Sequence, residues 1–465
     1  MGYFRVEKKG KTMIARKLDT FLDKFYKTQN KALLLTGARQ VGKTEAFRRF
    51  AARTYRNYIE INFIKTPDAI GIFDGAQSAG DILLRLSTFT RIPMVPGETF
   101  ILFDEVQACK ECVTQIKFLV DEGSYAYGLT GSLLGVELND IRSEPVGYMD
   151  VMDVFPLDFE EFVRAVGVAE RVIEALRESF ENRSPVDPLV HSQMMSVFSL
   201  YLIVGGMPAA VWQYIRTRNM QHVTAEQQAI LRTYKRDISR YNREKKLYLD
   251  EVFDLIPSEL NAKNKRFILK KLNENAKFNR YENSFLWLKK AGVAIPVYNV
   301  EEPCVPLLLN KQRNLLKLFQ NDVGLLACQY ADGIQLRILR GEVDINYGAV
   351  YENVVAQELL AHGFEHLYYF NSKKQGEVDF LLEKGDGTLL PVEVKSGKNY
   401  AFHLALNNLL YNEDYRIPEA FVLCNDNVRV EGKVTYLPVY MTMFLQRKGG
   451  ITTGEYIPDI SALSA

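Results

Sequence analysis

The loop between residues 37 and 44 combines the residue types that bind phosphate. Gly37, Gly42, Lys43 and Thr44 fit the pattern G-x-x-x-x-G-K-[ST] at every fixed position. The glycines allow backbone amides to close around phosphate oxygens, Lys43 offers a cation to the β- and γ-phosphates, and the Thr44 hydroxyl is a Mg²⁺ ligand. The sequence therefore predicts an ATP site formed by Gly37, Ala38, Arg39, Gln40, Val41, Gly42, Lys43 and Thr44.

Hydrolysis of ATP needs an acidic pair near the phosphates, and the segment "ETFILFDEVQAC" offers one. Asp104 and Glu105 directly follow the apolar run 100–103. We expect Asp104 to hold the Mg²⁺ shell and Glu105 to be the catalytic group that polarises the attacking water. A strand ending in a solvated Asp-Glu turn is the alternative, but the phosphate-binding loop in the same chain favours catalysis.

A third apolar segment, "YGLTGSLLG", ends in Thr130, Gly131 and Ser132. The Ser132 hydroxyl is predicted to bind the γ-phosphate or the attacking water as a sensor. The same three letters also form ordinary turns, so the order of this segment after the other two is what favours the sensor role.

Acidic residues near the C-terminal end form a second candidate site. The segments "EVDFLLE" and "LLPVEVKS", joined by "KGDGT", read as a β-hairpin. Strand alternation places Glu377 and Asp379 on one face of the first strand and Glu393 and Lys395 on one face of the second, and pairing of the strands would bring these faces together. Asp379 and Glu393 would bind Mg²⁺, and Lys395 would ready water for attack on a phosphodiester, with Glu352 as a further acidic group. A cross-strand ion pair is the alternative explanation of an isolated E-x-K.

The elements that would carry these residues change in character along the chain. Strand and helix signals alternate up to about Phe155, which predicts a parallel sheet with helices on both faces. From Pro156 to about Tyr241 the apolar spacing is helical, as expected for a lid over the nucleotide.

The basic segment 262–290 is followed by the strand-like "AGVAIPVYNV", which suggests a winged-helix module. Lys263, Lys265, Arg266, Lys270 and Lys271 would meet phosphates there, unless they form a solvated helix face.

Bulk composition excludes several classes of protein. The 58 Lys and Arg residues balance 57 Asp and Glu residues, so the chain is not a polycation that coats nucleic acid or membrane. Five cysteines in 465 residues fit a reducing compartment, and we expect a cytoplasmic protein. Cys109 and Cys112 have no second cysteine or histidine pair at zinc spacing. No window has the length and apolarity of a membrane span, so no membrane partner is expected.

Several motifs in a fixed order carry a family resemblance. They are "LLLTGARQVGKT", "FILFDEVQ", "LTGSLL", "FPLDFEEF", "YLIVGGMP", "YKRDISRY", "SFLWLKKAGV", "FQNDVGLL", "YENVVAQEL", "EVDFLLE" and "PVEVKSGKN". The chain resembles bacterial and archaeal AAA+ family ATPases that pair an AAA domain of the AAA_14 type with a C-terminal DUF4143 domain. The resemblance implies ATP binding by the loop, Mg²⁺ and water activation by Asp104 and Glu105, and a PD-(D/E)xK nuclease-like fold around Asp379, Glu393 and Lys395.

The expected architecture is an α/β protein of four parts. They are a P-loop AAA+ ATPase core over 1–185, a helical lid over 186–245, a winged-helix-like module over 246–325 and a DUF4143-type nuclease-like domain over 326–465. The expected function is ATP hydrolysis coupled to a domain that binds or cleaves nucleic acid, with ATP and Mg²⁺ as cofactors. DNA, RNA, a protein partner and self-association are the partners considered.

Two other functions agree with the same sequence. One is a nucleotide-dependent regulatory switch whose C-terminal domain binds protein or DNA without cleaving anything. The other is a degenerate ATPase that holds nucleotide only structurally. Relatives often carry Gly-Arg where this chain has Gly147-Tyr148, which puts efficient hydrolysis in doubt. Four arginines are candidate substitutes, namely Arg142, Arg164, Arg236 and Arg240.

Overall fold

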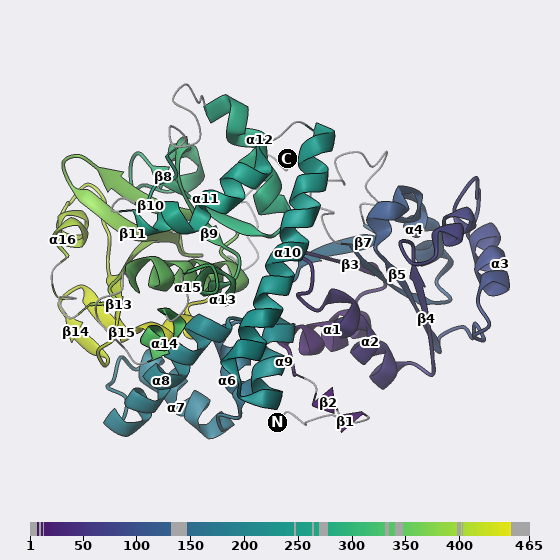
Figure 1. The fold of residues 1–465 in the computed structure, drawn as a ribbon, viewed down its shortest axis with the longest axis horizontal. Helices are drawn as coiled ribbons and strands as arrows, with labels where there is room; N and C mark the ends of the chain where they lie inside the picture. Colours follow the sequence, from purple (N-terminus) through teal and green to yellow (C-terminus); the bar gives the residue numbers. More distant parts are fainter. Residues whose placement is uncertain are drawn as a thin grey trace, which may run out of the picture.

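The computed structural model shows two lobes on either side of the long helix α10 (Met220–Lys245) (Figure 1). It describes residues 7–8, 11–12, 14–131, 147–245, 248–262, 265–268, 278–330, 334–339, 347–397, 401 and 403–447. Some sequence predictions lie outside these residues, namely those on Ser132, Arg142, Lys263, Lys270 and Lys271. A two-stranded ribbon, β1 (Glu7–Lys8) with β2 (Lys11–Thr12), precedes the first lobe.

The first lobe is built on a parallel sheet of five strands in the order β4-β5-β6-β3-β7. The strands are β3 (Ala32–Thr36), β4 (Asn57–Asn62), β5 (Thr99–Asp104), β6 (Ala126–Thr130) and β7 (Met149–Asp153). The helices are α1 (Lys17–Thr28), α2 (Lys43–Thr54), α3 (Ala79–Phe89) and α4 (Lys110–Glu122), with short turns η1 (Pro67–Ile72) and η2 (Val106–Ala108). All parallel strands end at one edge, where the phosphate-binding loop follows β3.

Alternating side chains of the sheet are buried in two separate cores. Leu33 and Phe100 pack with α1 and α2 on one face, whereas Leu34 and Ile101 pack with α3 and α4 on the other. A strand buried on both faces must be apolar throughout, which explains runs such as "ALLL". The predicted parallel sheet with helices on both faces is therefore confirmed.

The region after Asp153 is helical, as its apolar spacing predicted. The helices are α6 (Phe159–Val166), α7 (Glu170–Glu181), α8 (Pro188–Val204), α9 (Pro208–Thr217), α10, α11 (Leu249–Asn261) and α12 (Phe278–Lys290). Asp158 caps α6 by accepting a hydrogen bond from the Glu161 amide, and Gly167 ends the helix in the left-handed conformation. None of the described helices is long and apolar enough to cross a membrane.

The second lobe contains a mixed sheet of eight strands in the order β14-β15-β13-β12-β11-β10-β8-β9. The strands are β8 (Ala294–Val300), β9 (Lys311–Gln320), β10 (Leu367–Ser372), β11 (Gly376–Glu383), β12 (Leu389–Val394), β13 (Ala420–Cys424), β14 (Arg429–Glu431) and β15 (Val434–Pro438). The helical elements are α13 (Val323–Ala327), α14 (Ile334–Leu339), α15 (Tyr347–Ala361), α16 (Leu404–Leu410), η5 (Leu307–Asn310) and η6 (Val439–Phe444). The predicted hairpin is present as antiparallel β11 and β12.

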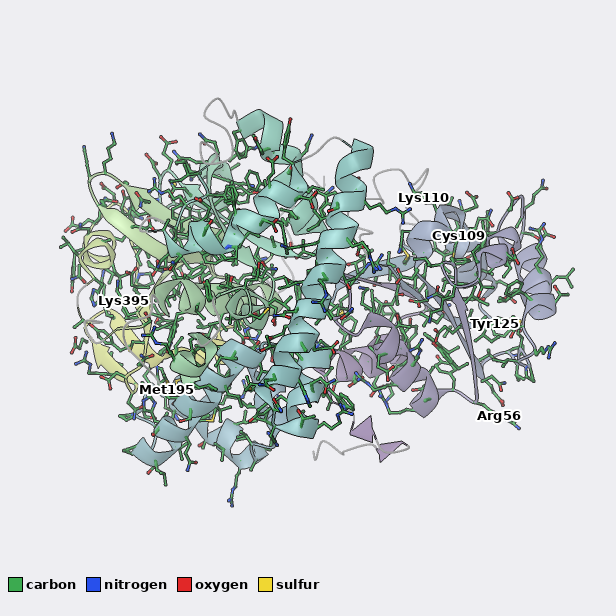
Figure 2. The ribbon with its side chains drawn as sticks, viewed as in Figure 1. Arg56, Cys109, Lys110, Tyr125, Met195 and Lys395 are labelled. Carbon is green, nitrogen blue, oxygen red and sulfur yellow. The ribbon has the colours of Figure 1, made fainter. Side chains whose placement is uncertain are left out.

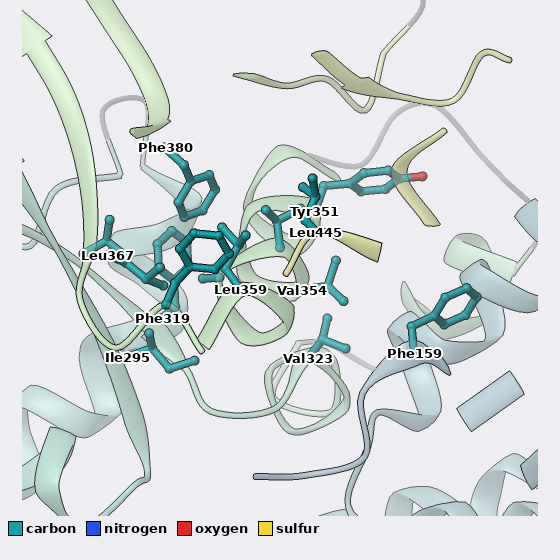
Figure 3. Close-up of a cluster of buried hydrophobic side chains, with 14 of the residues drawn as sticks. Phe159, Ile295, Phe319, Val323, Tyr351, Val354, Leu359, Leu367, Phe380 and Leu445 are labelled. Atoms are coloured by element: carbon teal, nitrogen blue, oxygen red, sulfur yellow. The ribbon is translucent and has the colours of Figure 1, made fainter. Parts of the chain in front are cut away.

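Strands β8 and β9 differ from the winged-helix expectation. Instead of forming the wing of a separate module, they extend the C-terminal sheet, because β8 pairs in parallel with β10. The sheet therefore crosses the boundary expected between residues 325 and 326. Apolar residues of β8 and β9, such as Ile295 and Phe319, belong to one continuous core with residues of α15 and with Phe159 of α6 (Figure 3). Helix α6 and the C-terminal sheet, which are far apart in the sequence, therefore belong to the same core.

Candidate functional site

The phosphate-binding loop connects the end of β3 to the start of α2 in a conformation that needs glycine. Gly37 has φ +115°, and a Cβ atom there would lie 2.4 Å from the Val154 carbonyl oxygen. Gly42, with φ +98°, directly precedes α2. These left-handed positions allow the backbone to curl so that amides at the helix N-terminus face an anion.

Lys43 is held inside this loop. Its Nζ donates hydrogen bonds to the carbonyl oxygens of Gly37 at 2.8 Å and Ala38 at 2.7 Å, and the residue is only 8% exposed. Burial lowers the pKa of the Lys43 ammonium to about 8, although Glu105 and Asp104 pull it upward. A buried ammonium bonded to backbone carbonyls, next to a helix N-terminus, is suited to bind a polyphosphate anion.

The first carboxylate of the acidic pair lies beside the loop. Asp104 ends β5, and its Oδ1 accepts a hydrogen bond from Thr44 Oγ1 at 2.9 Å, while its Oδ2 accepts one from Asn62 Nδ2 at 2.6 Å. The Thr130 hydroxyl also donates to Asp104. The hydroxyl and carboxylate expected to bind Mg²⁺ are thus already adjacent, so these residues fit the ion that the fold implies.

Asn62 was not assigned a role from the sequence, and Thr130 was named there only as part of the strand end that carries the expected sensor hydroxyl. Each is the last residue of a strand next to β5, so the parallel sheet brings both side chains to Asp104. A polar residue that ends a buried strand is the signal that points to them. The neighbouring Ser132 cannot be placed, because it lies outside the described residues.

Glu105 follows in the left-handed conformation, with φ +59°. Such a backbone is strained for a residue with a side chain, and strain of this kind gathers at functional sites. Glu105 interacts electrostatically with Asp237 of α10, which also forms an ion pair with Arg39 of the loop at 2.7 Å. Helix α10 therefore carries charged groups to the place where the attacking water is expected.

The candidate substitutes for the missing arginine differ in their surroundings. Arg236 and Arg240 lie close enough to Asp237 to interact with it electrostatically. Burial raises the pKa of Asp237 above its ordinary value, although Arg39 and these two arginines pull it downward. Arg164 instead pairs with Glu160 at 2.9 Å and Glu170 at 2.7 Å, within α6 and α7. Arg236 and Arg240 are thus the described substitutes that lie near the nucleotide site.

The second lobe also touches the phosphate-binding loop. A Cβ atom at Gly292, in the turn between α12 and β8, would lie 2.9 Å from the Ala38 amide nitrogen. Tyr234 of α10 donates a hydrogen bond to the Arg39 carbonyl oxygen at 3.2 Å and accepts one from Asn321 at 3.3 Å. The nucleotide site therefore has one wall from the ATPase lobe and contacts from α10 and the second lobe.

We expect ATP affinity to fall about tenfold between pH 7 and pH 9. Lys43 has a pKa of about 8 in the free protein, and contact with phosphate would raise it. Binding of ATP therefore takes up a proton on Lys43 between pH 7 and pH 9. At higher pH the free Lys43 amine is neutral and does not attract the phosphates. Titration calorimetry in buffers of different ionisation enthalpy would measure both effects. Equal affinities at pH 7 and pH 9 with a folded chain would contradict this assignment.

A second group of charged residues surrounds a pocket of about 560 Å³ in the C-terminal lobe. It is lined by Lys265, Glu352, Glu377, Asp379, Glu393, Val394 and Lys395. The carboxylates come from α15, β11 and β12, so the hairpin and the helix do bring these side chains to one place. Figure 2 shows Lys395 in this lobe, far along the molecule from Cys109 and Lys110 of the ATPase lobe.

A lysine that the sequence did not single out lies at the centre of this acidic group. Lys317 of β9 is fully buried, and its Nζ lies 2.8 Å from Glu377 Oε1, 3.1 Å from Glu352 Oε2 and 3.5 Å from Asp379 Oδ1. Burial alone would lower the pKa of Lys317, but the carboxylates of Glu352, Asp379 and Glu377 outweigh it and raise that pKa well above its ordinary value. Lys317 therefore stays charged.

The two described basic residues that were expected to meet phosphates turn toward the same pocket. Lys265 forms an ion pair with Glu352, and Arg266 lies 3.7 Å from a carboxylate oxygen of Glu377. Neither side chain faces solvent as part of a basic surface, since both are less than one-third exposed. Lys265 thus compensates the buried carboxylate of Glu352, and Arg266 lies beside the partly exposed carboxylate of Glu377.

The remaining carboxylates are also engaged. Asp379 Oδ2 accepts a hydrogen bond from the Val394 amide at 2.9 Å, and Lys395 Nζ donates to Glu393 Oε1 at 2.6 Å. Burial and repulsion from Asp379 raise the pKa of Glu393 to about 8, against the effect of Lys395. Among the described residues, no group of three or more His, Cys, Asp or Glu side chains is placed to hold a metal ion. As arranged here, the pocket does not fit the divalent ion expected from the nuclease-like resemblance.

Family models match three successive parts of the chain. Residues 29–163 match an AAA domain, residues 195–335 a domain of unknown function called DUF8612, and residues 347–441 another called DUF4143. The DUF8612 match extends across the regions that the sequence assigned to a lid and to a winged helix. The DUF4143 match contains both strands of the acidic hairpin.

Solved structures also match the chain, at low sequence identity and with TM-scores below 0.5. A Walker-type ATPase of Pyrococcus abyssi is 16% identical, with 71% of this chain and 96% of that chain covered and a TM-score of 0.40. The Orc1 protein of Aeropyrum pernix, solved in complex with DNA, is 16% identical, with 67% and 87% covered and a TM-score of 0.27. RuvB of Thermotoga maritima is 14% identical, with 60% and 86% covered and a TM-score of 0.28.

No curated protein matches the chain. The assignment of the first lobe therefore rests on the family match together with the parallel sheet and the loop that follows its strand β3. Residues 29–163 form an AAA-type P-loop ATPase domain.

Proposed function

We propose that the chain binds and hydrolyses ATP with Mg²⁺ and that this activity is coupled to a C-terminal, nuclease-like domain that binds or cleaves nucleic acid. The observation that carries the ATPase proposal is the position of Asp104. It accepts hydrogen bonds from Thr44 of the phosphate-binding loop and from Asn62 and Thr130, at the edge where the parallel strands end.

Each residue of the nucleotide site has a separate task in this proposal. Lys43 and the loop amides would bind the β- and γ-phosphates, and Thr44 with Asp104 would hold Mg²⁺, which neutralises charge on the phosphate oxygens. Glu105 would orient and polarise the attacking water. Arg39 forms an ion pair with Asp237 of α10, which fixes the Arg39 guanidinium in the phosphate-binding loop.

Strand β9 gives a physical route for coupling between the lobes. Its last residue, Gln320, exchanges two hydrogen bonds with Asn353 of α15, at 2.8 and 3.1 Å, and the next residue, Asn321, reaches the loop through Tyr234. The same strand carries Lys317, which contacts three of the acids that line the pocket. A shift of the loop on ATP binding would therefore be transmitted to β9 and to α15, whose Glu352 lines the pocket.

Two functions of the C-terminal domain agree with this coupling. The meeting of Asp379, Glu393 and Lys395 at one pocket speaks for cleavage of a phosphodiester, whereas the lack of a described group of acids placed to hold a metal ion speaks against it. The buried ammonium of Lys317 among the acids favours a regulatory switch whose C-terminal domain binds its partner without cleavage.

Turnover of ATP with and without DNA or RNA, measured beside a plasmid-cleavage assay, tests the proposal. Hydrolysis that nucleic acid stimulates supports the coupling, and nicking with Mg²⁺ or Mn²⁺ supports the nuclease. Hydrolysis unchanged by nucleic acid, without nicking, would favour a protein partner. A chain that binds ATP but does not hydrolyse it would contradict the ATPase proposal.

Gly292→Ala is expected to weaken ATP binding about tenfold, because the new methyl group would press on the Ala38 amide of the phosphate-binding loop. Gly97→Ala is the matched control. Gly97 has nearly the same φ, +72° against +70°, but a Cβ atom there would meet nothing within 4 Å. Calorimetry would compare the two variants, and equal ATP affinities would show that the contact between the lobes does not influence the loop.

A further inference from the structure

Lys317 lies on an edge strand of the sheet and is nevertheless completely buried. Helices α11 and α15 pack on β9, and the Lys317 ammonium lies 5.1 Å from the centre of the Tyr369 ring. A buried ammonium loses its hydration, so it is stable only where fixed negative charge and hydrogen-bond acceptors replace water. Glu352, Glu377 and Asp379 supply both.

The contacts of these acids leave few carboxylate oxygens free to bind an additional cation. Both carboxylate oxygens of Glu352 face a lysine, Oε1 facing Lys265 and Oε2 facing Lys317. Asp379 accepts the Val394 amide with Oδ2 and faces Lys317 with Oδ1. A divalent ion needs several oxygen ligands at short distance, and these oxygens are already bound to ammonium or amide groups.

Glu393 is the exception, because its Oε2 is buried and has no hydrogen-bond partner among the described residues. Its other oxygen accepts a hydrogen bond from Lys395 at 2.6 Å. One free carboxylate oxygen is enough to accept a hydrogen bond from a ligand. It is too little to replace the water shell of Mg²⁺ or Mn²⁺.

We infer that the Lys317 ammonium is the resident cation of this pocket, doing the electrostatic work that a divalent metal would otherwise do. This inference rests on the proposed role of the C-terminal domain, and it favours binding of a partner without cleavage over cleavage of a phosphodiester. The acids are held together without metal, and the pocket serves binding rather than metal-dependent cleavage. Lys317 is in this sense a positioning residue, since it fixes Glu352, Glu377 and Asp379 in one arrangement.

Thermal melting of the full chain without nucleotide, in EDTA and in millimolar Mn²⁺, tests this inference. Lys317→Met keeps an apolar side chain of similar length but leaves three carboxylates, of which Glu352 and Asp379 are buried, without their common cation. We expect Mn²⁺ to raise the melting temperature of Lys317→Met by about 5 °C or more, and that of the unchanged chain by less than about 1 °C. Lys384→Met is the matched control, because Lys384 pairs with Glu419 near the surface of the same sheet.

Two outcomes would overturn the inference. One is an Mn²⁺ response of the unchanged chain as large as that of Lys317→Met. The other is a Lys317→Met variant that melts like the parent in EDTA. If Lys317→Met does not fold, the double variant Lys317→Met with Glu352→Gln, which also removes one negative charge, should fold without metal. Failure of that double variant to fold would equally contradict the inference. Because ATP is absent from the assay, an error in the ATPase assignment would not affect the result.

Discussion

Replacing Lys43 by alanine is expected to lower ATP affinity at least about 100-fold while the chain stays folded. The Lys43 ammonium is the buried cation of the loop, and its only hydrogen bonds described here go to the carbonyl oxygens of Gly37 and Ala38. Its pKa is lowered by burial, which means that the charged form is destabilised before a phosphate arrives. Removal of the ammonium should therefore not reduce the melting temperature of the nucleotide-free protein.

Calorimetric titration with ATP and Mg²⁺ measures the affinity, and thermal melting without nucleotide measures the stability. Lys31→Ala is the control, because Lys31 lies on the same lobe and pairs with Asp150 at the opposite end of the sheet's strand β3. It should bind ATP like the parent. An unchanged affinity in Lys43→Ala would remove the nucleotide site from this loop. A large loss of stability would show that Lys43 instead supports the fold.

The ATPase lobe is the part of the molecule that the sequence predicted best. The loop pattern, the acidic pair after an apolar strand and the alternation of strands and helices are all local signals. Each depends on residues within about fifteen positions of one another, such as Gly37 to Thr44 or Phe100 to Glu105. The hairpin of β11 and β12 was predictable for the same reason.

Contacts between distant segments could not be read from the sequence. Lys317 reads as one basic residue in "NLLKLFQ", and nothing local indicates that β9 joins the C-terminal sheet through β8 and turns this side chain toward Glu352. Gly292 likewise reads as an ordinary turn, although it contacts the loop more than 250 positions earlier in the chain. Such pairings depend on tertiary packing, which the hydrophobic periodicity of a single segment does not indicate.

Composition alone does not decide the role of the basic segment 262–290, of which Lys263, Lys270 and Lys271 lie outside the described residues. A cluster of lysines and arginines normally indicates a solvated helix face or a phosphate-binding surface. Here Lys265 and Arg266 face Glu352 and Glu377, whose positions on α15 and β11 are about one hundred residues away. Charge density alone could not distinguish compensation of buried acids from recognition of nucleic acid.

Glu105→Gln is expected to keep ATP binding and to slow hydrolysis at least about 100-fold. The amide has the shape of the carboxylate, so the left-handed backbone at φ +59° and the turn that follows β5 should be preserved. An amide cannot accept the proton of the attacking water. It also removes a negative charge near Lys43, so ATP affinity should not fall and the variant should accumulate as an ATP-bound form.

The carboxylate of Asp237 is the nearest rival for this role, since it interacts with Glu105 and lies on α10 beside Arg39. Single-turnover hydrolysis of Glu105→Gln and Asp237→Asn, each with ATP affinity measured separately, distinguishes them. If Glu105 is the base, Asp237→Asn should mainly change affinity, because it releases Arg39, and should retain most of the chemical step. If Glu105→Gln hydrolyses ATP at the parental rate while Asp237→Asn does not, the catalytic carboxylate is supplied by α10. The chemistry would then depend directly on the helix that lies between the two lobes.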